Sequence, residues 1–465
     1  MMNSFDIIVI GSGPGGYVAA IRASQLGMKV GVVEKAEPGG ICLNWGCIPT
    51  KALLKSAQVL EYCRHASEYG ISSGGDTAAD FTAVIARSRG VADAMSKGIQ
   101  YLFKKYNIEI IKGFGRLKGN SAVEVETSEG ATETYSAKHI IIATGARSKE
   151  LPNLKQDGKK IIGYREAMSL PVLPASMVVV GSGAIGSEFA SFYRSMGTEV
   201  TLVEFMPRVL PLEDEEVSRT VERSFKKAKM KVMTGSSVEK VDITGDNCRI
   251  TIKTPKGEEV IMADIVLSAV GVIPNIEGIG LEENSVMTDR GKIIVDKYYK
   301  TSIEGVYAIG DIVPGPALAH VASAEAIVCV EKIAGHNPEP VDYNNIPACT
   351  YTSPEVASCG MTEESARTAG KEIKTGKFMF MASGKASASG AHEGFVKLVF
   401  DATDNKLLGA HMTGMNVTEL IASMVLARRM GATAVDIMRS IHPHPTMSEA
   451  VMEAAAAAMG EAIHG

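Results

Sequence analysis

The sequence predicts an α/β protein with two doubly wound parallel sheets, because one strand–turn–helix–strand pattern occurs twice. The first copy begins near Phe5 and the second near Ser176. Each copy reads as an apolar strand, a glycine turn, an amphipathic helix and a second apolar strand that leads to a glutamate. Strands that alternate with helices form parallel sheets with helices on their faces. A length of 465 residues allows about three domains, and the repeat accounts for two of them.

Both turns carry three glycines at the same spacing. They are Gly11, Gly13 and Gly16 in the first copy and Gly181, Gly183 and Gly186 in the second. The first glycine permits the tight turn, the second lets the backbone approach a pyrophosphate, and the third lets the helix pack against the strand. A pyrophosphate would then accept hydrogen bonds from the amides at the helix N-terminus. The repeat therefore predicts two dinucleotide-binding (Rossmann-like) units.

Each copy places an acidic residue where a nucleotide ribose is expected. Glu34 follows Gly11 by 23 positions, and Glu204 follows Gly181 by the same number. A carboxylate at this place accepts hydrogen bonds from the ribose hydroxyls and repels a 2′-phosphate. Glu204 therefore favours NAD over NADP in the second unit, and the nearby Arg208 keeps NADP as the alternative.

Two further segments, 138–146 and 304–313, read as short buried strands that end in tight turns. Asp311 lies at the carboxyl end of the second strand, which is the edge where ligands bind in open α/β sheets. It could equally be the N-cap of the alanine-rich helix that follows. The residues alone leave both roles open.

Cys42 and Cys47 follow the first repeat directly, in the segment GGICLNWGCIPTK. Their spacing is not that of a Cys-x-x-Cys motif, and two cysteines are too few for a zinc site. On an ideal helix, residues five apart have Cα atoms about 8–9 Å apart, beyond the limit of about 7 Å for a disulfide. A bridge therefore requires a distorted turn, which Gly46 can provide. A strained, accessible disulfide is of the reducible, catalytic kind, whereas the alternative is two buried cysteines without a function.

Composition argues against several classes of partner. The net charge of −5 and the lack of basic runs give no reason to expect nucleic acid or a membrane surface. The N-terminus enters an apolar strand without a basic leader, so we expect no secretory signal. No apolar stretch approaches the roughly 18 residues of a membrane helix, so we expect none. The remaining cysteines show neither pairing nor metal-ligand spacing, so we expect small buried side chains, no metal and a reducing cytosol. They are Cys63, Cys248, Cys329, Cys349 and Cys359.

The motifs occur in the order found in the flavoprotein pyridine nucleotide–disulfide oxidoreductases, which the chain resembles over nearly its whole length. They are GSGPGG, GGICLNWGCIPTKALL, ATGA, GSGAIGSE, AIGD and HPHPTMSE. The likeness implies two nucleotide domains, with the FAD domain split by the NAD domain, and an α+β C-terminal dimerisation domain. The implied ranges are 1–150 and 274–346 for FAD, 151–273 for NAD and 347–465 for the homodimer interface.

The same resemblance implies the nucleotide-binding residues. Lys51 would lie beside the flavin ring and pair with Glu188, although both also read as solvated helix residues. The residues implied for FAD are Gly11, Gly13, Gly16, Glu34, Lys51, Gly115, Thr144, Gly145, Asp311 and Ala319. Those implied for NAD are Gly181, Gly183, Gly186, Glu188, Glu204 and Gly271.

An acid–base pair is implied near the C-terminus. His444 would take a proton from a thiol, because the thiolate is the reactive form, and Glu449 would fix the tautomer of the imidazole. The family's spacing favours His444 over His442. The run from Thr446 to Glu449 also reads as a capping box for a packed tail helix around 454–458, so Glu449 has a structural reading as well.

The resemblance implies an activity too. It is strongest to members that oxidise protein-bound dihydrolipoamide to lipoamide with NAD, as a shared component of 2-oxo acid dehydrogenase or glycine cleavage complexes in the cytoplasm. Cys42 would exchange with substrate, and Cys47 would face the flavin. The alternatives are an NAD(P)H-dependent reductase of glutathione or another small disulfide, and a flavin-binding subunit without turnover. Val272 stands where many members carry arginine, so the family's ionic contact to the nucleotide is not carried over to that position.

Overall fold

The computed structural model describes residues 4–72 and 77–464, and the chain divides into two compact units. Unit 1 comprises Met1–Leu53, Thr82–Lys149 and Gly271–Val341. Unit 2 comprises Leu54–Phe81, Glu150–Val270 and Asp342–Gly465. The finer division into four domain segments stays a prediction. Within the described ranges, no helix combines the length and the apolar character needed to cross a membrane.

Unit 1 is built on a seven-stranded sheet with parallel strands at its centre. The strand order is β3-β2-β1-β6-β5-β4, and β19 also pairs with β6. Strands β1, β2, β3, β6 and β19 run parallel, whereas β5 and β4 continue the sheet antiparallel. The strands are β1 (Ser4–Ile10), β2 (Val30–Glu34), β3 (Glu109–Lys112), β4 (Phe114–Leu117), β5 (Ala122–Glu126), β6 (Thr132–Ile142) and β19 (Val306–Ala308). The three apolar strands predicted from the sequence thus lie side by side, in the order β1-β6-β19.

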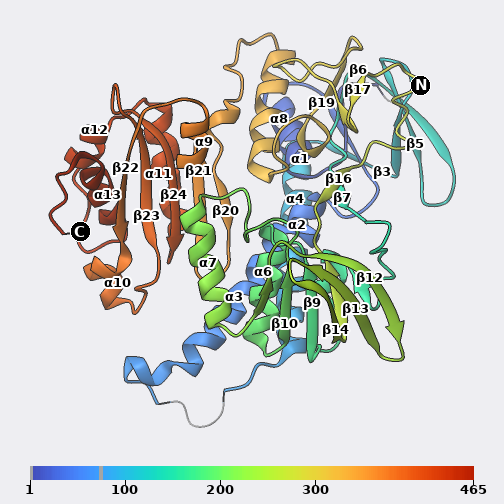
Figure 1. Cartoon of the computed structure of the whole chain (residues 1–465). Helices are drawn as coiled ribbons and strands as arrows, with labels where there is room; N and C mark the ends of the chain where they lie inside the picture. Colours follow the sequence, from blue (N-terminus) through green and yellow to red (C-terminus); the bar gives the residue numbers. More distant parts are fainter. Residues whose placement is uncertain (1–3, 73–76, 465) are drawn as a thin grey trace. The chain divides into compact units, whose positions relative to one another are not determined.

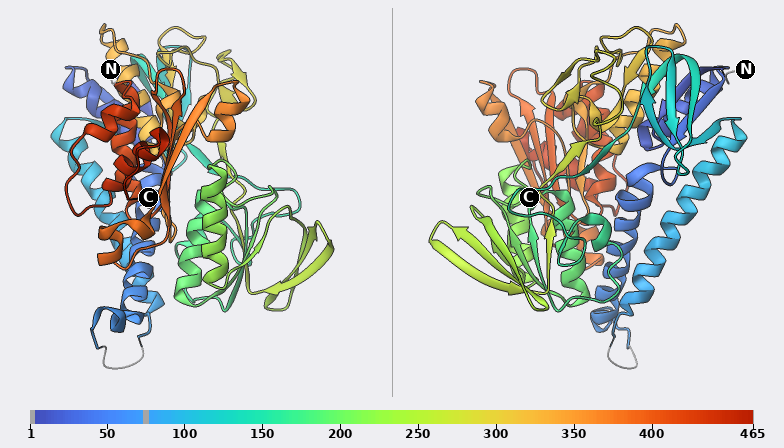
Figure 2. Two further views of the ribbon diagram at one scale, coloured as in Figure 1. Left: turned by 60° about the vertical axis from the view of Figure 1, so that its left-hand side comes forward. Right: turned by 90° about the vertical axis from the view of Figure 1, so that its right-hand side faces the viewer.

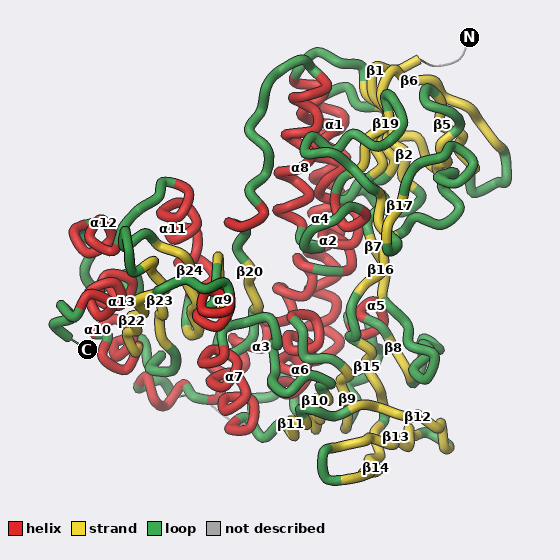
Figure 3. The backbone as a smooth tube through the Cα atoms, turned by 45° about the horizontal axis from the view of Figure 1, so that its top comes forward, coloured by secondary structure: helices red, strands yellow, loops and turns green. Residues whose placement is uncertain are grey.

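Helices α1 and α8 lie side by side in unit 1 (Figure 3). Their apolar residues pack with those of the central strands, and Ala20, Ile141 and Ala326 are fully buried in this core. Strands covered in this way are apolar on both faces, which explains the continuous runs in the sequence. The helices that begin in unit 1 or end in it are α1 (Pro14–Gln25), α2 (Gly40–Trp45), α3 (Cys47–Arg64), α4 (Phe81–Lys105) and α8 (Ala319–Ile333). Two short strand pairs complete the unit, β7 (Ala146–Ser148) with β16 (Val272–Pro274) and β17 (Thr288–Asp289) with β18 (Lys292–Ile293).

Unit 2 contains a second parallel sheet, with five strands in the order β11-β10-β9-β15-β8. The strands are β8 (Ile161–Ile162), β9 (Ser176–Val180), β10 (Glu199–Val203), β11 (Lys231–Met233) and β15 (Ile265–Ser268). Its helices are α5 (Tyr164–Ala167), α6 (Ala184–Met196) and α7 (Glu215–Lys227). Figure 2 shows a separate antiparallel sheet beside it, formed by β12 (Ser237–Thr244), β13 (Asn247–Thr254) and β14 (Gly257–Ala263). The order β10-β9-β15 reproduces β2-β1-β6 of unit 1, so the sequence repeat is also a structural repeat.

The C-terminal part of unit 2 is an antiparallel five-stranded sheet in the order β20-β21-β24-β23-β22 (Figure 1). The strands are β20 (Ala348–Thr350), β21 (Glu355–Gly360), β22 (Ile373–Met379), β23 (Phe395–Asp401) and β24 (Leu407–Gly414). The helices are α9 (Glu363–Thr368), α10 (Gly384–Ala388), α11 (Val417–Arg429), α12 (Ala434–Arg439) and α13 (Glu449–Met459). Helix α11 packs on β21 and β24, and α13 packs on β22 and β23. The predicted packed tail helix is α13, whose Ala454 and Ala455 are fully buried.

Candidate functional site

The glycine turn of unit 1 leaves an open N-terminus on helix α1. Gly11 has φ +103°, a conformation that L side chains rarely adopt. A Cβ on Gly16 would lie 1.9 Å from the Gly11 carbonyl oxygen, so only glycine allows helix and strand to approach this closely. Among the described residues, a Cβ on Gly13 would meet only Gly40 Cα, at 4.0 Å, and no side chain caps the helix. The turn therefore has the room and the amide donors that a pyrophosphate needs.

The acidic residue after each repeat is held by a serine of the glycine turn, which the sequence analysis did not single out. Ser12 donates to the Glu34 carboxylate through its backbone N–H at 2.9 Å and its hydroxyl at 2.6 Å. Ser182 donates to Glu204 in the same two ways, at 2.7 and 2.6 Å. Both serines are fully buried. A signal was present, because serine occupies the same place in both copies, and its two bonds fix the carboxylate where ribose hydroxyls are expected.

The turn of unit 2 repeats this geometry. Gly181 has φ +99°, and a Cβ on Gly186 would lie 1.9 Å from the Gly181 carbonyl oxygen. A Cβ on Gly183, the N-cap of α6, would meet no described atom within 4 Å. One turn into α6, Glu188 is buried, and its Oε1 accepts a hydrogen bond from the Tyr351 backbone N–H at 2.9 Å. The reading of Glu188 as a solvated helix residue is therefore wrong.

The helix that carries the cysteine pair is broken between the two cysteines. Helix α2 ends at Trp45, and helix α3 begins at Cys47. Gly46 between them has φ −147° and ψ −118°, outside the helical region. A Cβ on Gly46 would lie 3.0 Å from the Ile41 carbonyl oxygen and 3.3 Å from Cys42 Cα, so a larger residue would press on the turn. The prediction of a distorted turn at Gly46 is confirmed.

The two cysteine side chains are in contact with each other. The Cys42 thiol hydrogen-bonds to the Cys47 side chain. This bond, burial and the charge on Cys47 raise the pKa of Cys42, although the charge of Lys51, one turn into α3, opposes the shift. The raised pKa favours the protonated form of Cys42. Lys51 belongs to unit 1 and Glu188 to unit 2, so their expected pairing stays a prediction.

Polar side chains that hold this turn were not identified from the sequence. The buried Asn44 donates from Nδ2 to the carbonyl oxygens of Pro38 and Gly40, at 3.1 and 3.0 Å. Trp45, the only tryptophan of the chain, stacks against Arg89 of α4, whose guanidinium carbon lies 3.9 Å from the ring centroid. Asn44 could have been noticed, because it stands between the two cysteines in the motif. Arg89 carries no such signal, since only the fold brings α4 against α2.

Asp311 lies in a short 3-10 turn, Gly310–Ile312, at the carboxyl end of β19. Helix α8 has Leu318 as its N-cap, so the alternative of Asp311 as that N-cap is wrong. Burial raises the pKa of Asp311. The fully buried Glu325 of α8 holds the turn, because it accepts a hydrogen bond from the Gly310 N–H at 2.6 Å. Glu325 is a further residue that sequence reasoning missed.

The other residues implied for the nucleotides lie at strand ends and in turns of unit 1. Thr144 Oγ1 donates to the Asn275 carbonyl at 2.7 Å, and Asn275 Nδ2 donates back to the Thr144 carbonyl at 3.0 Å. A Cβ on Gly115 would lie 3.0 Å from the side chains of Ile10 and Val33, so strand packing alone already favours a small residue there. The remaining positions, in turns or at the start of a helix, are Gly145, Gly271 and Ala319. The nucleotide-binding roles of these residues stay predictions.

His444 and Glu449, both in unit 2, are in direct contact. His444 Nδ1 lies 2.9 Å from Glu449 Oε1. Burial alone would raise the pKa of Glu449, but hydrogen bonds from the Thr446 N–H and from His444 outweigh it and lower the pKa. Glu449 therefore stays ionised near neutral pH, and a carboxylate on Nδ1 leaves Nε2 as the basic nitrogen of the imidazole. The competing His442 has no such carboxylate, and its buried Nε2 has no hydrogen-bond partner within the described residues.

The expected capping box of the tail helix is only half formed. Helix α13 begins at Glu449, and its N-cap, Ser448, makes no side-chain hydrogen bond to the helix. Glu449 Oε2 accepts from the Thr446 N–H at 2.9 Å. The Thr446 hydroxyl, however, donates to the Pro443 carbonyl at 2.7 Å instead of accepting from the helix. The prediction was wrong on this half, because the turn before α13 uses the hydroxyl for its own closure.

Two of the five scattered cysteines are not buried as the sequence predicted. Cys63 is exposed and Cys349 is half-buried, whereas the other three are buried. Cys63 lies in the last turn of α3, where residues 62–65 are all exposed. The buried cysteines are Cys248, Cys329 and Cys359.

Comparison with known proteins covers both units. Residues 5–326 match the family described as pyridine nucleotide-disulphide oxidoreductase. Residues 346–455 match the dimerisation domain of the same family. The chain belongs to the pyridine nucleotide-disulphide oxidoreductase family. Nucleotide domains followed by a dimerisation domain are the arrangement that the sequence predicted, and this fold prediction is confirmed.

Members of this family resemble the chain from end to end. A dihydrolipoyl dehydrogenase of Rhizobium etli is 48% identical over 480 residues, with all of both chains covered. The dihydrolipoyl dehydrogenase of Bacillus subtilis is 43% identical, again with all of both chains covered. The crystal structure of LpdA from Mycobacterium tuberculosis superposes with a TM-score of 0.90 at 26% identity, covering 97% of this chain and 99% of that one.

Proposed function

We propose that the chain is a dihydrolipoyl dehydrogenase, which oxidises dihydrolipoamide to lipoamide with NAD. The observation that carries the proposal is the broken helix at Gly46, which brings the Cys42 thiol into hydrogen-bonding contact with Cys47 in the unit that also holds a dinucleotide turn. The names of relatives that match over the whole chain support the choice of substrate.

The residues of unit 1 fit FAD as the resident cofactor. The open turn at Gly13 and the uncapped N-terminus of α1 suit its pyrophosphate, and the serine-held Glu34 suits its ribose. Asp311 and Lys51 would contact the rest of the cofactor. When bound, FAD relays two electrons between the reduced cysteine pair and a nicotinamide nucleotide. The second turn, with Glu204 at the strand end, would hold NAD.

The cysteine and histidine residues have complementary tasks in the proposed reaction. His444 Nε2 takes a proton from one thiol of dihydrolipoamide, and the thiolate attacks Cys42 Sγ of the Cys42–Cys47 disulfide. A mixed disulfide forms, and Cys47 leaves as a thiolate. The second substrate thiol then displaces Cys42, which takes up that thiol's proton. The substrate loses two electrons and two protons, the cysteine pair gains the electrons, and the protons reside on Cys42 and His444. The raised pKa of Cys42 supports this distribution.

Partners follow from the same proposal. The match of 346–455 to a dimerisation domain supports a homodimer, in which His444 would serve the cysteine pair of the other subunit. An isolated monomer would then be inactive. The natural substrate would be a lipoyl group carried by a 2-oxo acid dehydrogenase or glycine cleavage complex, in the cytoplasm.

The test compares Cys47→Ser with Cys63→Ser as the matched control, because Cys63 is an exposed cysteine outside the proposed site. We expect NAD-dependent oxidation of dihydrolipoamide to fall by at least about a hundredfold in Cys47→Ser and to stay unchanged in Cys63→Ser. Wild-type activity in Cys47→Ser would contradict the proposal. If the wild-type protein reduced glutathione disulfide with NADPH faster than it oxidised dihydrolipoamide with NAD, the small-disulfide reductase would be favoured instead.

A further inference from the structure

The segment that follows β10, residues 204–214, folds back onto the glycine turn of unit 2. Glu204 is bound to Ser182 at the start of the segment, and its Oε1 also accepts from the Met206 N–H at 2.7 Å. Further along, the Leu210 N–H donates to both the carbonyl and the hydroxyl oxygen of the same Ser182, each at 3.2 Å. Leu210 is buried and has φ +45°, a backbone conformation that is uncommon for a residue other than glycine. Its contacts with Ser182 and its burial therefore hold the segment in a conformation that the backbone alone disfavours. The segment therefore lies where the adenosine ribose of a nucleotide is expected.

Arg208 is the only cation in this segment. It stands between two residues that are tied to Ser182, four positions after Glu204, the residue expected to bind the ribose. A guanidinium at such a place is the group that accommodates a 2′-phosphate in NADP-binding proteins, because it matches the phosphate oxygens with paired donors. The sequence alone therefore favoured NAD through Glu204 and kept NADP as the alternative because of Arg208.

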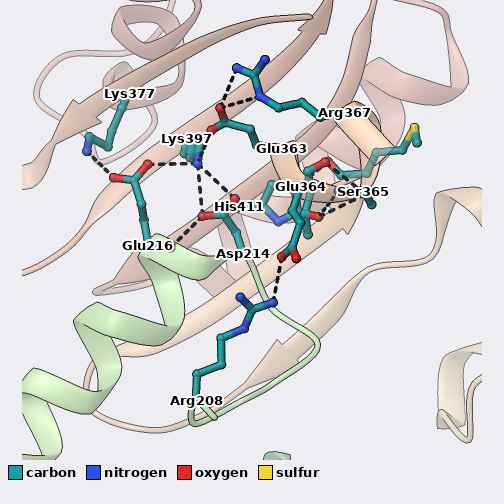
Figure 4. A network of polar contacts seen from close by, with 12 residues as sticks. Arg208, Asp214, Glu216, Glu363, Glu364, Ser365, Arg367, Lys377, Lys397 and His411 are labelled. Atoms are coloured by element: carbon teal, nitrogen blue, oxygen red, sulfur yellow. Dashed lines mark hydrogen bonds and ion pairs between the residues drawn. The ribbon is translucent and has the colours of Figure 1, made fainter. Parts of the chain in front are cut away.

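The structure shows where the guanidinium goes. Arg208 Nη2 lies 3.0 Å from Glu364 Oε2, at the start of helix α9 (Figure 4). The Arg208 side chain is 28% exposed, whereas Glu364 is 68% exposed, so the arginine is the partly buried member of the pair. The positive charge of the segment is thus already paired before any nucleotide binds.

Helix α9 is held firmly enough to present Glu364. The Thr362 hydroxyl caps the helix by accepting from the Ser365 N–H at 3.0 Å. Glu363, beside Glu364, accepts from Lys397 at 2.8 Å and from Arg367 at 2.9 Å. Backbone and side-chain contacts therefore fix the first turn of α9, although Glu364 itself reaches toward solvent.

Lys397 ties the far end of the 204–214 segment to the same place. This buried lysine of β23 lies 3.1 Å from Asp214, which ends the segment, and 2.9 Å from Glu216 in the first turn of α7. Asp214 also caps α7 by accepting from the Glu216 N–H at 3.0 Å. Burial alone would lower the pKa of Lys397, but hydrogen bonds with Glu363 and Glu216 and the charge of Asp214 raise it, so the ammonium persists. One cation thus fixes both the segment and the helix that carries Glu364 (Figure 4).

We propose that Glu364 determines nucleotide specificity together with Glu204, by pairing with Arg208 and withholding its guanidinium from an adenosine 2′-phosphate. Glu204 repels the phosphate directly, and Glu364 removes the one cation of the segment that would attract it. The inference rests on the proposed use of NAD by unit 2. It assigns a role in cofactor choice to a residue of the C-terminal domain, which is 156 positions from Arg208 in the sequence.

The test measures binding rather than turnover. The dissociation constants of adenosine 5′-monophosphate and adenosine 2′,5′-bisphosphate are determined by calorimetry with the FAD-loaded dimer. The two ligands differ only in the 2′-phosphate, so the ratio of their constants isolates that group. In a Glu204→Ala background, where the direct repulsion is gone, Glu364→Gln should shift the ratio toward the bisphosphate by about fivefold. A factor of five corresponds to about 1 kcal/mol, the size expected of one exposed ion pair that no longer competes.

Two further variants show whether Arg208 is the cause. Adding Arg208→Gln to the Glu204→Ala, Glu364→Gln protein should abolish the gain. Arg208→Gln in the wild-type background should leave the ratio within about twofold, because the guanidinium is already engaged by Glu364. Glu222→Gln is the matched control, since it removes the same charge and an exposed ion pair with Lys226 elsewhere on unit 2. It should leave the ratio unchanged.

Definite outcomes would overturn the inference. The first is that Glu364→Gln leaves the ratio of the two dissociation constants unchanged in both the wild-type and the Glu204→Ala backgrounds. Another is a weaker bisphosphate affinity when Arg208→Gln alone is introduced, because that would show a guanidinium already available to the ligand. A wild-type protein that prefers the bisphosphate would instead contradict the proposed use of NAD. Equal FAD content and equal thermal midpoints among the variants show that folding does not cause the differences.

Discussion

Replacement of Lys397 by methionine should loosen the start of helix α7 from the C-terminal sheet within unit 2. The lysine side chain is 5% exposed and pairs with Asp214, Glu216 and Glu363. Removing one member of a buried ion pair costs about 3–5 kcal/mol, because the remaining charge is left without a partner. Only Asp214, at 3% exposed, is buried in this way. Glu216 and Glu363 are 39% and 29% exposed and regain water, so we expect the lower end, about 3 kcal/mol.

Amide hydrogen exchange of the intact protein measures this loss locally. The Glu216 N–H, which donates to Asp214, should exchange about a hundredfold faster in Lys397→Met, because about 1.4 kcal/mol corresponds to a factor of ten. Lys377→Met is the control. It removes another lysine that pairs with Glu216, but Lys377 is 41% exposed, so the change should stay under about 1 kcal/mol.

A double variant separates lost attraction from stranded charge. Lys397→Met combined with Asp214→Asn should recover most of the protection, because the buried carboxylate no longer carries an unpaired charge. The reasoning would be refuted by exchange at Glu216 within about threefold of the wild-type rate in Lys397→Met. A double variant less protected than Lys397→Met would also contradict it.

Two other predictions concern the cysteine turn and a buried carboxyl group. Gly46→Ala should lower dihydrolipoamide oxidation about tenfold and change the fluorescence emission of Trp45, because the new Cβ at position 46 would press on the Ile41 carbonyl. Gly98→Ala is the control, because a Cβ there would meet no described atom within 4 Å. Wild-type turnover in Gly46→Ala would contradict the argument. Burial raises the pKa of Glu213 to about 7, so the folded state loses stability as pH rises from 4.5 to about 7. Between about pH 5 and about pH 7.5, the free energy of unfolding of the wild-type protein, obtained from denaturation midpoints, should fall by about 2 kcal/mol more than that of Glu213→Gln. Parallel pH profiles of the two proteins would exclude this effect.

Local spacing predicted a large part of the fold and of the site. The two glycine turns and the acidic residues 23 positions further on follow from the geometry of one strand–helix–strand unit. The distorted turn at Gly46 follows from the spacing of the two cysteines. Such patterns can be recognised in a sequence because each residue's role depends on neighbours a few positions away. The serines beside the first glycines belong to the same class, and the repeat itself could have revealed them.

For other residues the sequence allowed two interpretations, and only the fold could decide between them. Asp311 is not the N-cap of α8, because the helix starts at Ala319 with Leu318 as its N-cap, after a longer loop than the sequence suggested. Glu188 is buried and accepts from the backbone N–H of Tyr351, which directly follows strand β20 of the C-terminal sheet. The hydroxyl of Thr446 closes its own turn, so the capping box read from the sequence is incomplete.

By itself, the sequence determined the two dinucleotide units, and it predicted the redox pair and the carboxylates that favour NAD. Tertiary structure decided which distant residues hold these groups in place. Arg208 meets Glu364 across 156 positions, and Asp214 meets Lys397 across 183. No local preference links such residues. Their contact is set by the path of the chain and the burial of a charge, and these exist only once the sheets and helices have packed.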